Sequence, residues 1–113
     1  MPKYLVLYNS PTPAAKMMAN STPEQMQAGL KMWTDWSNKV GGALVDFGNP
    51  LDEGKRVDEK SSVSDSDSQA TGFSIIEAAS LDDAVKLVEG HPHLHTPGGA
   101  SIDVLPFIQM QGM

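Results

Sequence analysis

Two segments with strong helix-start signals, each lying between strand-like runs, constrain the fold of this chain most. Thr22 and Ser80 each precede apolar residues at helical spacing, and Gln25 and Asp83 stand where a capping box requires them. Glycine ends both segments, because it can adopt the backbone conformation that closes a helix. The chain therefore has two predicted helices, with strands around them.

Four short runs of β-branched, aromatic and leucine residues predict strands, at 4–8, 43–47, 73–78 and 102–108. The order β-α-β-β-α-β predicts an α+β protein with a ferredoxin-like antiparallel sheet and both helices on one face. A length of 113 residues fits one domain, 1–113. The charged, serine-rich stretch at about 51–71 predicts a polar flexible loop, in which 55–57 gives a weak strand signal.

Both faces of the predicted sheet are partly apolar. In the first strand Leu5 and Leu7 point to one face, whereas Tyr4, Val6 and Tyr8 point to the other. Two helices can cover only one face, and an uncovered apolar face predicts an interface or a cavity. A homodimer with the two sheets packed face to face would cover it.

Charge and composition exclude several classes of protein. Eight basic and fourteen acidic residues give a net charge of −6, without the basic patch that nucleic acids or anionic membranes require. The chain has no cysteine, which excludes disulfides, thiolate catalysis and cysteine-ligated zinc. No run approaches the roughly 20 apolar residues of a membrane span, and the opening apolar run is too short for a signal peptide. The sequence thus predicts a cytoplasmic protein.

All three histidines lie within five residues, at His91, His93 and His95, directly after the second predicted helix. Histidine suits acid–base chemistry and metal binding because its usual pKa is close to neutral. Three interpretations remain open: a Zn, Ni or Cu site on an extended segment, part of a ligand pocket, or a polar loop that caps the helix end. We expect neither a metal nor a cofactor, and we regard His91 and His93 as the leading candidates for catalysis.

Tyr8, Ser74 and His95 are the further candidates for a ligand pocket. Tyr8 ends the first strand with a polar tip that can line a pocket at the open face of the sheet, although an ordinary interface tyrosine is the more common case. Ser74 has no Gly-X-Ser-X-Gly elbow around it and no base that the sequence identifies.

The first predicted helix carries two tryptophans and a carboxylate between them. Trp33 is expected in the core and Trp36 at its border. Asp35 falls on the opposite side of this helix, four residues after Lys31, which predicts an exposed ion pair rather than a general base.

Several segments resemble the YCII-related (DGPF-type) family. They are the opening 3–8, the stretch 71–78, Ser80-Leu81-Asp82-Asp83-Ala84, Gly90-His91-Pro92-His93-Leu94 and the ending 102–107. The resemblance implies a dimeric α+β barrel built on the ferredoxin-like unit. Most members have no established function, while some are small enzymes, including a dehydrochlorinase of aromatic degradation. In those enzymes a histidine on the first helix and an aspartate before a proline after the second helix are the proposed acid–base pair.

This chain departs from the family pattern at both of those positions. The first predicted helix has no histidine, and Lys31 stands nearest to the expected place. His91, not aspartate, precedes Pro92, and residues 64–69 read Ser-Asp-Ser-Asp-Ser-Gln where the DGPF motif would lie. The resemblance therefore carries the fold, but not this catalytic pair.

Two functions from different classes remain. The first is a small-molecule-binding or noncatalytic interaction module, with a second copy of the chain and a small-molecule ligand as partners. The alternative is a cofactor-independent acid–base enzyme, lyase or dehydrochlorinase-like, that uses His91 or His93. Since the sequence identifies no carboxylate to orient the histidines, it favours the first.

Overall fold

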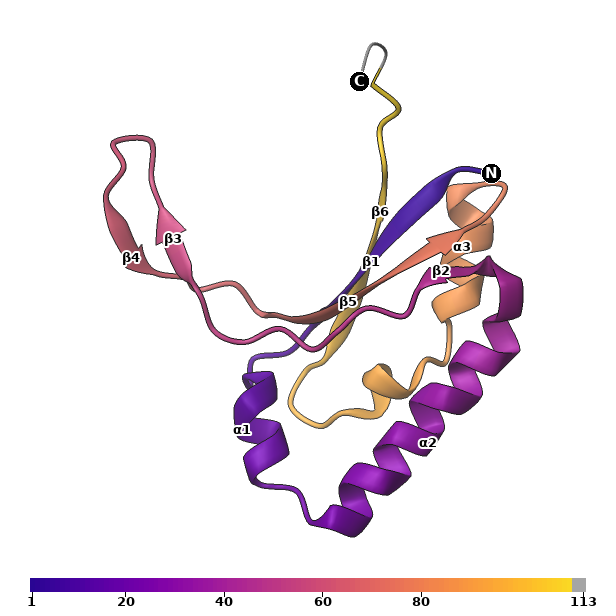
Figure 1. The fold of residues 1–113 in the computed structure, drawn as a ribbon, viewed down its shortest axis with the longest axis horizontal. Coiled ribbons are helices and arrows are strands. Elements are labelled where there is room, and N and C mark those ends of the chain that lie inside the picture. Colours follow the sequence, from indigo (N-terminus) through magenta and orange to yellow (C-terminus); the bar gives the residue numbers. More distant parts are fainter. Residues whose placement is uncertain (111–113) are drawn as a thin grey trace.

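The computed structural model describes residues 1–110 and has one four-stranded antiparallel sheet with two long helices (Figure 1). In chain order, its elements are β1 (Lys3–Asn9), α1 (Ala14–Ala19), α2 (Pro23–Val40), the 3-10 turn η1 (Gly41–Ala43), β2 (Leu44–Asp46), β3 (Lys55–Val57), β4 (Val63–Asp65), β5 (Ala70–Glu77), α3 (Leu81–Val88), the 3-10 turn η2 (Pro92–His95) and β6 (Ser101–Pro106). The strand order β2-β5-β1-β6 interleaves two βαβ halves. The predicted α+β, ferredoxin-like fold is confirmed.

Both predicted helix starts are present. Thr22 and Gln25 form a complete capping box. The Gln25 N–H donates to Thr22 Oγ1 at 3.1 Å, and the Thr22 N–H donates to Gln25 Oε1 at 2.9 Å. Ser80 caps α3 by accepting the Asp83 N–H at 3.1 Å. After α3, Gly90 takes a φ of +71°, the left-handed conformation in which glycine is favoured. The turn at Gly90 brings the chain back towards the sheet.

The core lies on the helix-covered face of the sheet. Tyr4, Val6 and Tyr8 of β1 are buried there, as the alternation of the strand predicts. Trp36 is also buried and donates its indole N–H to the Leu87 carbonyl at 2.9 Å. Because this bond ties α2 to α3, Trp36 belongs to the core rather than to its border.

Trp33, by contrast, is only half-buried, although the sequence predicts it in the core. The N-terminal half of α2 lies beside α1, away from α3 (Figure 1). Helix α1 itself was not predicted, because the Met17-Met18 stretch lacks a clear start signal. The space between α1, α2 and the sheet is therefore lined by residues that periodicity assigns to a core.

The opposite face of the sheet carries a row of apolar side chains. Leu5 pairs with Ile75 on one side and with Leu105 on the other, and Leu7 pairs with Phe73. Leu105 is 47% exposed, and the other four are half-buried. Helices α2 and α3 pack against the core cluster, which lies on the opposite face of the sheet. They therefore leave the face with Leu5 and Leu105 uncovered.

The stretch at about 51–71 contains two short strands, of which the sequence gives a weak signal only for the first. Strands β3 and β4 pair as an antiparallel hairpin that projects from the rest of the molecule (Figure 1). Cross-strand pairs of Lys55 with Asp65 and of Arg56 with Asp67 join its two arms, and the weak strand signal at 55–57 is confirmed. Within residues 1–110, no helix has the length and apolarity that crossing a membrane demands.

Candidate functional site

The turn that follows α3 gathers two of the three histidines at the sheet. His91 caps η2 by accepting the His93 N–H on its Nδ1 at 2.9 Å. His91 and His93 are consequently buried, whereas His95 is exposed. The segment is a 3-10 turn rather than the extended strand that would align all three imidazoles. Nor does any group of three or more His, Asp or Glu side chains within 1–110 form a constellation that could hold a metal ion.

His91 is enclosed by three aromatic rings. Its ring centroid lies 4.3 Å from that of Trp36, 4.5 Å from that of Trp33 and 4.9 Å from that of Tyr8. Because Nδ1 accepts a hydrogen bond, the proton of the neutral ring sits on Nε2. This Nε2 is sealed from solvent and has no hydrogen-bond partner among the described residues; the aromatic rings around it can offer weak N–H···π contacts.

The same enclosure fixes the charge of His91. Burial, with a smaller contribution from the charge of His93, lowers the pKa of His91 from 6.5 to about 3. The imidazole is therefore neutral near pH 7, and neither of its nitrogens is accessible to a bound molecule.

The two ring nitrogens of His93 differ in their hydrogen bonding: Nε2 is hydrogen-bonded within the protein, and Nδ1 has no partner among the described residues. Its Nε2 lies 2.7 Å from the Asn9 carbonyl oxygen, which can only accept, so Nε2 carries a proton and donates it. In the neutral ring, Nδ1 then keeps a lone pair. The ring lies 5.3 Å from that of Tyr8, so these two polar side chains are neighbours.

Tyr8 begins a short chain of hydrogen bonds across the sheet. Its hydroxyl lies 2.8 Å from Ser74 Oγ, and Ser74 Oγ donates to the Phe47 carbonyl at 2.7 Å. A serine hydroxyl has only one proton, so Tyr8 is the donor to Ser74. Burial raises the pKa of Tyr8 to about 12, although the bond to Ser74 partly opposes that shift. The phenol therefore keeps its proton near pH 7.

Tyr8 and His93 both line a pocket of about 590 Å³ between α1, the first turns of α2 and strand β5. Most of its wall is apolar, and the lining includes three methionines and several aromatic residues. The described residues that line it include no Asp, Glu, Lys or Arg. A mostly apolar concavity with a few polar groups is typical of small-molecule sites.

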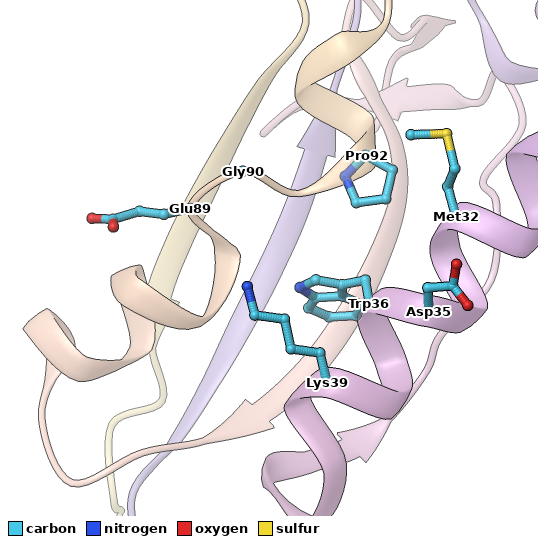
Figure 2. Close-up of a pocket in the computed structure, with 7 residues that line it drawn as sticks. All are labelled: Met32, Asp35, Trp36, Lys39, Glu89, Gly90 and Pro92. Atoms are coloured by element: carbon cyan, nitrogen blue, oxygen red, sulfur yellow. The ribbon is translucent and has the colours of Figure 1, made fainter.

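A second hollow, of about 290 Å³, lies between α2 and the turn after α3 (Figure 2). Asp35 lines it but is paired with Lys31 at 2.9 Å, which confirms the predicted exposed ion pair. In Figure 2 the Glu89 carboxylate points away from the other side chains that line this hollow. No set of polar groups converges here, so the larger pocket is the better candidate site.

The structure brings together most of the residues that the sequence singles out. Tyr8 and His93 line the larger pocket, and Ser74 lies one hydrogen bond behind Tyr8. His91 lies behind Trp33 and His93, and His95 is exposed and outside the wall. The sequence interpretation missed the wall residues on the two helices, although the adjacent pair Met17-Met18 was an available signal.

Comparison with known proteins gives one clear match. The family model described as the YCII-related domain matches residues 4–108, which is nearly the whole chain. No curated protein matches the chain.

Proposed function

This chain belongs to the YCII-related domain family, and we propose that it is a small-molecule-binding protein whose ligand occupies the pocket between α1, α2 and the sheet. The observation that carries this proposal is the wall of the pocket. A largely apolar cavity of about 590 Å³, with no Asp, Glu, Lys or Arg among its described lining residues, has the side chains of Tyr8 and His93 as neighbours in its wall. Apolar surface supplies the affinity of such a site, and a few polar groups orient the ligand.

His91 supports this proposal as a positioning residue. Its Nδ1 is bonded to the His93 N–H, and its ring fills the space between Trp33 and Trp36. A general acid or base must reach the proton that it transfers. Since both nitrogens of His91 are enclosed, we assign it the task of holding the η2 turn, and with it His93.

One observation favours the alternative function, a cofactor-independent acid–base enzyme of the lyase type. The Asn9 carbonyl fixes the His93 ring and leaves Nδ1 with a free lone pair, as a general base requires. No described carboxylate lines the pocket to stabilise the imidazolium that proton removal would form. Binding without chemistry therefore has the stronger support.

We also propose that a second copy of the chain covers the helix-free face of the sheet. Ile75, Leu5 and Leu105 form an apolar row across three strands there, and Phe73 and Leu7 extend it on two of them, while Asp103 pairs with Leu7 on the third. Exposed apolar patches of this kind mark interaction surfaces, and a two-fold axis lets one such surface cover its own copy.

A pocket-filling variant tests the binding function. Gly29 lies on α2 in the pocket wall, and a Cβ there would meet nothing within 4 Å. We expect Gly29→Phe to fold, since most residues suit a helix better than glycine. As probe ligands we use small molecules that carry a flat 2-naphthyl ring. The Gly29→Phe variant should bind them at least tenfold more weakly than the wild type, as measured by calorimetric titration. Met32→Phe is the matched control, because Met32 lines the smaller hollow instead.

If no 2-naphthyl compound binds the wild-type protein, the binding function fails. Equal affinities for the wild type and Gly29→Phe would place the bound molecule elsewhere. Mass spectrometry of each compound after incubation tests the enzyme alternative, which requires a product whose formation is lost in His93→Gln.

A further inference from the structure

A hydrogen bond inside the protein already uses the hydroxyl proton of Tyr8, a residue that lines the pocket. Ser74 donates to the Phe47 carbonyl, so the Tyr8 hydroxyl must donate to Ser74. What remains on the Tyr8 oxygen is a lone pair. Tyr8 can therefore accept a hydrogen bond from a ligand but has no proton left to offer one.

His93, like Tyr8, offers a hydrogen-bond acceptor rather than a donor. Its Nε2 proton goes to the Asn9 carbonyl at 2.7 Å, and Nδ1 has no partner among the described residues. Within that part of the chain, His91 Nε2 is the single side-chain atom that is both sealed and unpartnered. His93 Nδ1 is thus not sealed, and we take its lone pair to be open to the pocket that His93 lines.

Two more hydroxyls of the wall donate their protons to carbonyl groups of the protein rather than to the pocket. Ser21 donates to the Met17 carbonyl at 2.7 Å, and Thr71 donates to the Tyr8 carbonyl at 3.2 Å. Gln25 uses its Oε1 to accept the Thr22 N–H in the capping box, so its amide offers N–H groups as donors. The amides of Gln27 and Asn49 and the hydroxyl of Thr96 can act as donor or acceptor and do not select. The hydroxyl and imidazole groups whose protons are assigned all offer acceptors.

We propose that this pocket selects neutral alcohols with a flat apolar body, and that the ligand hydroxyl donates its proton to Nδ1 of His93. The inference rests on the proposed binding function and specifies its ligand class. A carboxylate would lose its hydration without meeting a lysine or arginine among the described residues of the wall. An ammonium group would meet no described carboxylate in the wall. An ether of the same shape would leave the imidazole nitrogen unpaired.

Four compounds with one ring system test this selectivity by calorimetric titration at pH 7.5. They are 2-naphthalenemethanol, its methyl ether, 2-naphthoate and 2-naphthylmethylammonium. We expect the alcohol to bind at least tenfold more tightly than each of the others. In His93→Phe, the ratio of alcohol to ether affinity should fall to about one while the ether binds as before. The control His95→Phe changes an exposed histidine outside the wall and should keep the wild-type ratio.

A measurement on the wild-type protein keeps the test valid if His93→Phe does not fold. The ¹⁵N resonance of His93 Nδ1 should move when the alcohol is added, because a hydrogen bond to the lone pair changes its shielding. The methyl ether should leave this resonance in place. A ¹⁵N shift that is the same for both compounds would contradict the assigned hydrogen bond.

The possible outcomes separate the two proposals. Equal binding of alcohol and ether, or tightest binding of the naphthoate or the ammonium compound, overturns the alcohol selectivity and leaves the binding function standing. Failure of all four compounds to bind removes the binding function, and the selectivity with it.

Discussion

His91 is a histidine whose side chain is completely buried among aromatic rings. Three aromatic rings lie within 4.9 Å of its own, and its Nδ1 caps the turn that carries His93. An imidazole in this position contributes packing and one hydrogen bond to the folded state. Protonation of the buried ring is unfavourable there, so it lowers the stability of the folded state. The consequence is a dependence of stability on pH.

The first prediction concerns this pH dependence. In the unfolded chain His91 has a pKa near 6.5, and in the folded protein the pKa is about 3. Below pH 6.5 the unfolded state binds one proton more than the folded state, so acid favours unfolding. The contribution of His91 is fully present above pH 6.5 and is lost as the pH falls towards 3. Between pH 6.5 and 5 we expect a loss of roughly 1–2 kcal/mol, measured by urea unfolding.

The His91→Asn variant should reduce the slope of the free energy of unfolding against pH by the contribution of about one bound proton. Asparagine can still accept the His93 N–H from the cap position but does not titrate. His95→Gln is the control, since His95 is exposed, and it should keep the wild-type slope. An unchanged slope in His91→Asn would contradict the assigned pKa.

The hydrogen-bond chain from Tyr8 gives a second prediction at this scale. Tyr8→Phe keeps the ring and removes one bond, which should cost about 1 kcal/mol. Ser74→Ala leaves both the Tyr8 hydroxyl and the Phe47 carbonyl without their partner, and buried unpaired groups cost about 1–3 kcal/mol each. Urea unfolding should therefore rank Ser74→Ala as the more damaging change. The opposite order would show that the chain does not run through Ser74.

At the scale of elements, the segment after β2 is what closes one side of the pocket. The Leu51 N–H bonds to the Thr71 carbonyl at 2.9 Å, and the Phe73 N–H bonds to the Asn49 carbonyl at 3.3 Å. This segment can approach β5 so closely because Gly48 has no side chain. A Cβ at Gly48 would lie 1.6 Å from the Phe73 carbonyl oxygen, and the φ of +82° also disfavours other residues.

Gly48→Ala should accordingly displace this segment. We expect a loss of at least about 2 kcal/mol in the free energy of unfolding, from backbone strain and the clash together. Gly42→Ala is the matched control, because its Cβ would meet nothing within 4 Å and its φ is not positive. Similar stabilities for the two variants would contradict the close approach of 47–51 to β5.

At the scale of the whole molecule, the sheet is covered on one face only. The helices bury Tyr4, Val6 and Tyr8, and they leave Leu5 and Leu105 on the other side. Leu105 is 47% exposed in the single chain. An apolar row that runs across β5, β1 and β6 is the kind of surface that a second protein surface can cover.

The mass in solution tests the proposed homodimer. We expect light scattering at micromolar concentration to give twice the mass of one chain. Leu105→Glu should reduce it to the mass of one chain, because two carboxylates would face each other's apolar row. Leu81→Glu, at an exposed leucine of α3, should stay dimeric. A wild-type protein with the mass of one chain would rule out the dimer.

Local sequence signals accounted for most of the fold. The capping box at Thr22, the Ser80 cap, the terminal glycines and the strand alternation act between near neighbours, so they are readable without a tertiary structure. The full capping box predicted at Ser80 is wrong in part, because the Asp83 side chain makes no return bond to the Ser80 backbone. The hairpin was harder to predict, because its cross-strand ion pairs join residues ten or more positions apart in a segment of loop-like composition. Helix α1 has no strong local signal at all, since its Pro13 cap makes no side-chain hydrogen bond.

The sequence by itself determined the two capped helices, the four strands of the main sheet, their order, and the position of the histidines directly after the second predicted helix. Only the tertiary structure decided that the turn hides His91, opens His93 to the pocket and leaves His95 outside. The physical reason is that proton positions and pKa depend on partners distant in the chain. The Asn9 carbonyl fixes one imidazole, and the rings of Trp33 and Trp36 enclose the other. Spacing along the chain carries no record of those contacts.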